Sequence, residues 1–188
     1  MGRCGAEIKV SNTSGVFEAI GKANMKKLYL IGGPMGVGKT AVGQALKRML
    51  PNSVFLDGDW CWDADPFQVT EETKAMVLDN ICHLLNNFLR CTAYETVIFC
   101  WVMHEQGILD HILRAVDVAG CAVRAVSLIC DAQTLETRLR ADVLRGVRTA
   151  DVIERSFARL PLYEALHTQK IDTSRKSIQA VAEEIAAL

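Results

Sequence analysis

The stretch that decides the fold is Gly33-Pro34-Met35-Gly36-Val37-Gly38-Lys39-Thr40, which matches the pattern GxxxxGK[ST] at every fixed position. It follows a short apolar run at residues 27–32 and opens an amphipathic segment at residues 37–50, the strand–loop–helix setting that the pattern requires. Glycines let backbone N–H groups turn toward an anion, and the following helix presents its free N–H groups at the same place. The stretch therefore predicts a P-loop, which binds the phosphates of a nucleoside triphosphate.

Two side chains of this loop have specific roles in phosphate chemistry. Lys39 is expected to reach the β- and γ-phosphate oxygens as a point charge, and the Thr40 hydroxyl is expected to ligate Mg²⁺. We therefore expect a nucleoside triphosphate and Mg²⁺ as cofactors; the preference for ATP rests on the missing guanine motif and the family resemblance described below. The residues of this stretch expected to contact the nucleotide are Gly33, Met35, Gly36, Val37, Gly38, Lys39, Thr40 and Ala41.

Outward from the loop, short apolar runs alternate with longer amphipathic segments. Strands are predicted at residues 27–32, 53–56, 96–103, 122–130 and 168–172. Helices are predicted at residues 37–50, 70–90, 106–119 and 174–188, with two more between 132 and 166. Near-continuous apolar runs suit strands that are buried on both faces of a parallel sheet. The pattern predicts an α/β protein with the P-loop NTPase fold, a five-stranded parallel sheet flanked by helices.

Length and composition are those of one globular domain. The chain has 188 residues, half of them hydrophobic, with a net charge of −1. This balance does not favour a general nucleic-acid or membrane binder, and no apolar run reaches membrane-spanning length. We expect an N-terminal extension of uncertain order at residues 1–24 and the kinase-like domain at residues 25–188.

The cysteines indicate a reducing compartment. There are seven, an odd number, and none has zinc-ligand spacing. Most lie in apolar runs, where a reduced cysteine packs as a small hydrophobic residue. We therefore predict a cytoplasmic protein.

A second motif separates the classes of triphosphate-binding protein. GTPases read guanine with an NKxD string, and the sequence has none. The second predicted strand ends instead in Asp57-Gly58-Asp59. The carboxyl ends of neighbouring parallel strands meet at the crevice where ligands bind, so both carboxylates can lie there. One could hold Mg²⁺ and the other could deprotonate an acceptor hydroxyl; we favour Asp57 for the metal and Asp59 as the base.

The P-loop GGPMGVGKT and the LDGD string at residues 56–59 resemble those of the small P-loop kinases: gluconate kinase, shikimate kinase, adenylyl-sulfate kinase and chloramphenicol phosphotransferase. In layout the resemblance covers residues 26–188. It implies an ATP-dependent kinase that phosphorylates a hydroxyl of a small molecule, with a strand-end aspartate serving that hydroxyl. Gluconate kinase has His-Pro after its DGD-x-x, where this chain has Trp60-Cys61-Trp62-Asp63, so the resemblance does not imply the acceptor.

Arginines crowd residues 138–159, after the fourth predicted strand. In the small kinases this segment is a mobile lid, which implies that its arginines stabilise the transferring phosphoryl group. Our first choices are Arg138 and Arg145 for catalysis, and Arg138 and Arg148 for the nucleotide. The resemblance also implies that Thr173 and Ser174 border the adenine ring, although Ser174 fits a helix N-cap equally well.

Large aromatic side chains lie near the ends of the second and third predicted strands, where they could form an acceptor pocket or pack the helix at residues 70–90. The expected substrate-binding residues are Asp59, Trp60, Trp62, Trp101, His104 and Glu105. We expect a small-molecule acceptor, no nucleic acid or membrane partner, and a monomer or homodimer. Two alternatives stay open: a nucleotide-binding regulatory or interaction module with weak ATPase activity, and a nucleoside or nucleotide kinase.

Overall fold

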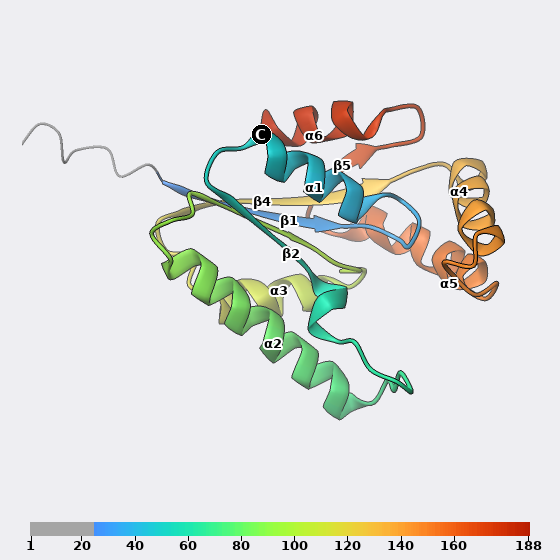
Figure 1. Ribbon diagram of the computed structural model, residues 1–188, viewed down its shortest axis with the longest axis horizontal. Coiled ribbons are helices and arrows are strands. Elements are labelled where there is room, and N and C mark those ends of the chain that lie inside the picture. The colour runs from blue at the N-terminus through green and yellow to red at the C-terminus, as the bar shows by residue number, and fades with distance from the viewer. Residues whose placement is uncertain (1–24) are drawn as a thin grey trace, which may run out of the picture.

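The computed structural model describes residues 25–188, so the predicted extension at residues 1–24 lies outside the described part. A five-stranded sheet forms the centre, with the order β2-β3-β1-β4-β5 and every pair parallel (Figure 1). The strands are β1 (Lys26–Gly32), β2 (Ser53–Asp57), β3 (Thr96–Cys100), β4 (Cys121–Ile129) and β5 (Gln169–Asp172). The predicted five-stranded parallel sheet is confirmed.

Helices follow the strands in alternation. The α-helices are α1 (Lys39–Met49), α2 (Glu71–Arg90), α3 (Gln106–Ala115), α4 (Ala132–Leu144), α5 (Val152–Arg159) and α6 (Ile178–Ala186). Two 3₁₀ segments are η3 (Gly58–Cys61) and η4 (Leu160–Ala165). In Figure 1, α1 and α6 lie together on one side of the sheet, α2 and α3 lie on the other, and α4 and α5 lie beyond one end.

Alternation along the buried strands separates the core into two layers. Leu28 and Leu30 of β1 pack in the cluster that includes α2 and α3, whereas Tyr29 and Ile31 pack in the cluster that includes α1 and α6. Successive side chains of a strand point to opposite faces of a sheet, so each central strand contributes to both layers. A sheet covered on both sides brings its functional groups to the ends of the strands.

Three predicted boundaries were wrong, and each error has a local cause. The third strand ends at Cys100 instead of residue 103, because its partner β1 turns into the P-loop after Gly32 and the Trp101 N–H bond to the Ile31 carbonyl is the last bond of their ladder. Helix α3 ends at Ala115 instead of residue 119, before a turn at Gly120, whose φ is 73°. Helix α6 begins at Ile178 with Ser177 as its N-cap, so the last predicted helix started too early.

The structure also tests the expectations about the cysteines and about membrane-spanning segments. All six cysteines within residues 25–188 are free thiols, as the odd count and apolar settings predict. No helix in this range combines the length and apolar character needed to cross a bilayer.

Candidate active site

The P-loop joins the carboxyl end of β1 to α1, and its backbone leaves the helix N-terminus open. Gly38 occupies the N-cap position with φ 104°, and no side chain caps the helix. By contrast, α2 is capped by the Thr70 hydroxyl and α4 by the Asp131 carboxylate. Because uncapped N–H groups and the positive end of the helix dipole attract anions, the start of α1 is suited to phosphate.

Gly36 shows why the loop cannot carry a side chain at this point. Its φ is 81°, and a Cβ placed on it would lie 2.6 Å from a methyl carbon of Leu139. Leu139 belongs to α4, so the loop packs directly against the helix that starts the predicted lid segment. This glycine is required both for the turn and for the close approach.

Lys39 is folded back onto the P-loop. Its Nζ donates to the carbonyls of Gly33 at 2.8 Å and Pro34 at 2.9 Å. Burial lowers the pKa of Lys39 to about 8, although nearby groups that include Asp59 and Asp57 act in the opposite direction. The ammonium is therefore partly desolvated and stabilises an anion strongly when one binds at the loop.

Asp57 ties the second strand to the P-loop. Its Oδ2 accepts a 2.6 Å hydrogen bond from the Thr40 hydroxyl, and its Oδ1 accepts the Asp59 N–H at 3.1 Å. The buried Cys100 thiol, at the end of the neighbouring strand β3, donates to Oδ2 at 3.4 Å. Thr40 and Asp57, both predicted metal residues, are therefore in direct contact.

These oxygens fit the predicted Mg²⁺. Mg²⁺ prefers oxygen ligands and binds through one or two protein groups together with phosphates, rather than in an all-protein cage. Among residues 25–188 there is no group of three or more His, Cys, Asp or Glu side chains that could hold a metal by itself. A hydroxyl and a carboxylate beside a phosphate loop are the type of site that needs the nucleotide to complete it.

Asp59 lies two residues further on and has a different environment. It is exposed, and its carboxylate accepts a side-chain hydrogen bond from Trp101. Partial burial and the Asp57 charge raise the pKa of Asp59, while Lys39, the Trp101 bond and Arg148 act against the shift. Asp59 is thus an accessible carboxylate within the electrostatic field of the P-loop lysine.

Trp101 leaves no room for a side chain at Gly58, the residue between the two aspartates. A Cβ on Gly58 would lie 2.4 Å from the indole ring of Trp101, which packs against it. This close approach holds the turn of η3 in place and sets Asp59 beside the indole. The sequence pattern Asp-Gly-Asp therefore has a packing cause in addition to its chemistry.

The three chosen lid arginines have different surroundings. Arg138 Nη1 donates to the Val37 carbonyl at 3.2 Å and to the Thr173 hydroxyl at 3.0 Å. Its Nη2 donates to the Thr173 carbonyl at 2.9 Å. It thereby joins the P-loop to the loop after β5. This position agrees with a nucleotide-binding role.

Arg148, but not Arg145, influences the site in this structure. The Arg148 charge acts on both Lys39 and Asp59, and its side chain also pairs with Asp142 at 3.3 Å. Arg145 pairs with the same Asp142 at 2.6 Å, and its side chain is 69% exposed. The predicted catalytic Arg145 therefore lies at the surface of the lid, whereas the charge of Arg148 acts on Lys39 and Asp59.

A pocket of about 440 Å³ lies beside the P-loop, on the side of Arg138. Thr173 is buried in its wall and bonds to the Ile129 carbonyl. Sequence reasoning missed further lining residues at the start of α6, because the last helix was predicted to begin at residue 174. The missed residues are Lys176, Ser177, Ile178 and Val181.

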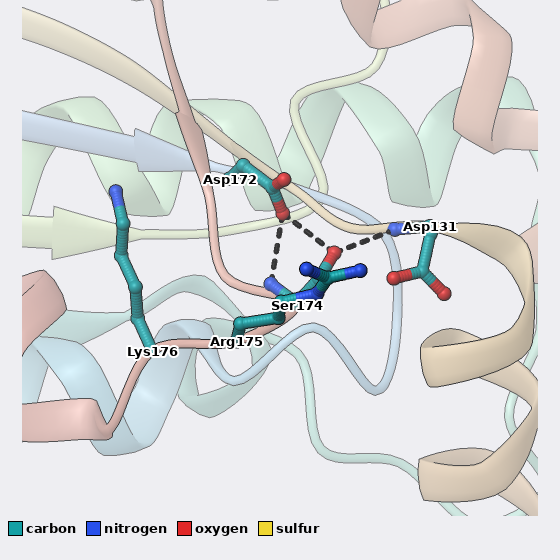
Figure 2. A pocket seen from close by; sticks show the side chains of 5 residues that line it. All are labelled: Asp131, Asp172, Ser174, Arg175 and Lys176. Atoms are coloured by element: carbon teal, nitrogen blue, oxygen red, sulfur yellow. Dashed lines mark hydrogen bonds between the residues drawn. The ribbon is translucent and has the colours of Figure 1, made fainter.

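A second pocket of about 370 Å³ shares Lys176 with the first (Figure 2). Figure 2 shows the Ser174 hydroxyl between Asp172, to which it donates at 2.6 Å, and the Asp131 N–H, from which it accepts at 2.9 Å. Ser174 is therefore not the N-cap of the last helix, which was the other interpretation of this residue. It holds the loops after β4 and β5 together at the edge of the pocket beside the P-loop.

The predicted acceptor residues divide into exposed and packed side chains. Trp60 is 60% exposed and meets Phe55 edge-on at 5.5 Å, while Trp62 lies on Phe67 at 4.6 Å. Trp62 and Trp101 also pack against the core cluster that includes α2, so the packing alternative is correct for part of the set.

His104 and Glu105 lie in the loop after β3. His104 contacts the Val102 carbonyl through Nδ1 at 3.0 Å, and its Nε2 lies 3.3 Å from Glu105 Oε1. These contacts hold the histidine side chain against its own loop. Glu105 remains largely exposed.

Comparison with solved structures agrees with this architecture. The tunicamycin resistance protein of Deinococcus radiodurans is 23% identical with a TM-score of 0.67, covering 86% of this chain and 94% of its own. A gluconokinase from Sinorhizobium meliloti 1021 is 16% identical with a TM-score of 0.63, covering 87% and 91%. A shikimate kinase from Acinetobacter baumannii is 22% identical with a TM-score of 0.56, covering 87% and 92%. At these identities the likeness concerns the fold, which is that of the predicted small P-loop kinase group.

Sequence comparison gives the family. No curated protein sequence matches the chain. A family model described as AAA domain matches residues 30–155, which is more than half of the chain and includes the P-loop, both strand-end aspartates and the arginines up to Arg155. The chain therefore belongs to the AAA domain family.

Proposed function

We propose that the protein is an ATP- and Mg²⁺-dependent kinase that transfers a phosphoryl group to a hydroxyl of a small molecule. The observation that carries the proposal is the 2.6 Å hydrogen bond from Thr40 to Asp57. It fixes the strand-end Asp57-Gly58-Asp59 directly against the phosphate loop. A triphosphate and an acceptor bound on either side of this contact would meet at Asp59.

The donor half consists of the P-loop, Lys39 and Arg138. The open N-terminus of α1 and the Lys39 ammonium would hold the phosphates, and Arg138 would hold the nucleoside side of the pocket. Thr40 and Asp57 would hold Mg²⁺, which neutralises phosphate charge when bound. Because the donors are fixed before the reaction, they need little reorganisation as charge develops on the phosphoryl group.

The acceptor half is centred on Asp59. An exposed carboxylate with a raised pKa is a better proton acceptor than an ordinary aspartate, and Asp59 would take the proton of the attacking hydroxyl. Arg148, whose charge already acts on Asp59 and Lys39, would offset negative charge on the transferring group. Catalysis would rest on positioning and electrostatics without a covalent intermediate.

The similar structures support a kinase. They include a gluconokinase, a sugar kinase and shikimate kinases, which are small-molecule phosphotransferases by name. A nucleoside kinase is a second candidate, because exposed aromatic rings such as Trp60 could stack on a base. A regulatory module with weak ATPase activity would have Lys39 and the P-loop but no responsive acceptor site.

The decisive experiment measures phosphoryl transfer from ATP to a panel of sugars, aromatic alcohols and nucleosides, with Mg²⁺ present. Asp59→Asn should lower transfer by roughly two orders of magnitude or more while leaving affinity for a non-hydrolysable ATP analogue nearly unchanged. Asp79→Asn, an exposed aspartate of α2 outside the proposed site, is the matched control and should retain activity. Undiminished transfer by Asp59→Asn would refute the base assignment, and no transfer to any acceptor would favour the regulatory module.

A further inference from the structure

The acceptor side of the site carries an unusual amount of exposed apolar surface. We use "acceptor wall" for residues 59–76 together with residues 101–105. Within it, Trp60, Phe67 and Val69 are each about 60% exposed, and Met76 is 44% exposed. Large apolar side chains exposed close together in the sequence and beside a reactive group are typical of a ligand site.

The wall is built on rigid elements next to Asp59. Trp101 bonds to the Asp59 carboxylate and packs on Gly58, while the Trp62 N–H bonds to the Asp59 carbonyl at 3.3 Å. The Asn80 amide of α2 donates to the Cys61 carbonyl at 3.2 Å, which ties η3 to the helix. The 3₁₀ segment that carries Trp60 is therefore held at a fixed place relative to the proposed base, and Phe67 packs on Trp62 of the same turn.

The one lysine of the wall, Lys74 in the first turns of α2, has acidic neighbours. The hydrogen bond and charge of Glu71 raise the pKa of Lys74, and the charge of Glu105, in the loop after β3, adds to this shift. Lys74 itself pairs with Glu71 at 2.8 Å.

Charge on this surface is almost entirely negative. Besides Asp59, it contains five exposed carboxylates: Asp63, Asp65, Glu71, Glu72 and Glu105. Its lysine and arginine content is the single Lys74, which is already paired, and His104 lies against Glu105. The wall itself has no arginine fork that recognises a carboxylate, sulfate or phosphate group. Lys39 and Arg148 act on Asp59 from the P-loop and the lid, where the proposed function uses both cations for the phosphoryl group.

From these observations we propose that the acceptor is a ring-bearing apolar alcohol without an anionic group, and that a basic amine on it strengthens binding. This inference rests on the proposed kinase function. The exposed rings of Trp60 and Phe67 bind the apolar body, and the surrounding carboxylates attract a cation and repel an anion. The hydroxyl then lies at Asp59.

The test uses alcohols that differ in charge on the same scaffold. Phenylalaninol is cationic, phenylpropanol is neutral and phenyllactate is anionic; glucosamine, glucose and gluconate form the same series without an aromatic ring. Affinity is measured by thermal shift with Mg²⁺ and a non-hydrolysable ATP analogue present. We expect phenylalaninol to bind about three- to tenfold more tightly than phenyllactate, and the sugars to bind more weakly than the phenyl compounds.

Charge substitutions assign this preference to the wall. Glu72→Lys should reduce the preference for phenylalaninol over phenyllactate, whereas Glu164→Lys, an exposed glutamate in η4 with the same charge change, should not. Trp60→Ala should weaken all three phenyl compounds without altering their order. Equal binding of phenyllactate and phenylalaninol, an equal effect of both glutamate substitutions, or no binding by any phenyl compound would overturn the proposal.

This design tests the ligand class and the kinase activity independently of each other. The charge preference is measured without hydrolysable nucleotide, so it stands or falls independently of turnover. If the compounds bind in the expected order of affinity but none is phosphorylated, the kinase proposal is refuted and the ligand class is supported. Transfer to gluconate or phenyllactate in preference to their uncharged partners would support the kinase and refute the ligand class.

Discussion

Lys39 makes nucleotide binding depend on pH in a predictable direction. In the free protein its pKa is lowered to about 8, mainly by burial. Phosphate oxygens beside the ammonium would favour its charged form, so a bound triphosphate should raise this pKa. Binding therefore takes up a proton whenever Lys39 is neutral in the free protein, and affinity should fall as the pH rises through about 8.

The magnitude follows from the fraction of protein in which Lys39 is charged. With a pKa of about 8 this fraction falls from about nine tenths near pH 7 to about one tenth near pH 9. If only the charged form binds, affinity for the triphosphate falls roughly tenfold over this range, which corresponds to about 1.4 kcal/mol.

Isothermal titration calorimetry with Mg²⁺ and a non-hydrolysable ATP analogue measures both quantities. Buffers with different ionisation enthalpies report proton uptake, which should approach one proton per site near pH 9 and nearly vanish near pH 7. AMP lacks the β- and γ-phosphates, so its affinity should not follow the Lys39 titration. Lys39→Met should bind the triphosphate weakly and remove the proton uptake. Constant affinity between these pH values, with no proton uptake, would refute the reasoning.

Two further substitutions test the strand-end motif. Gly58→Ala should lower the free energy of unfolding, measured by thermal denaturation, by about 1–3 kcal/mol, because the added Cβ collides with Trp101. The control Gly107→Ala in α3, where a Cβ meets nothing within 4 Å, should cause no loss of stability. Cys100→Ala removes a donor to Asp57 and should weaken Mg²⁺ activation of transfer by roughly two- to fivefold, whereas Cys100→Ser retains a donor and should not. A stable Gly58→Ala variant, or equal Mg²⁺ dependence of the two cysteine variants, would contradict these roles.

The sequence by itself determined the donor loop and the type of sheet. The P-loop conformation of residues 33–40 depends on nearby residues: glycines permit the turn, and the hydrophobic periodicity on either side predicts a strand and a helix. The near-continuous apolar runs predicted strands buried on both faces, and the five parallel strands confirm this. Such properties depend on neighbours in the chain, so a pattern of residues is sufficient to predict them.

Boundaries were less predictable because they depend on contacts with other segments. Trp101 continues an apolar run, but its partner strand β1 turns into the P-loop after Gly32, so the bond from the Trp101 N–H to Ile31 is the last one of the ladder. Ser174 has the character of a helix cap, yet Asp172 and the Asp131 N–H engage its hydroxyl, and Ser177 caps the helix instead. In both cases a tertiary partner competes with the local preference.

Only the tertiary structure decided how the functional groups meet. Asp57 and Cys100 lie 43 positions apart, and Arg138 and Thr173 lie 35 apart, yet each pair is in hydrogen-bond contact. The arginine-rich segment was evident from composition, but its geometry brings Arg148 rather than Arg145 into the field of Asp59. The sequence thus determined which chemical groups are available near a triphosphate, because motif residues are neighbours in the chain. Their pairing was decided by the sheet order, which brings the ends of distant strands to one edge.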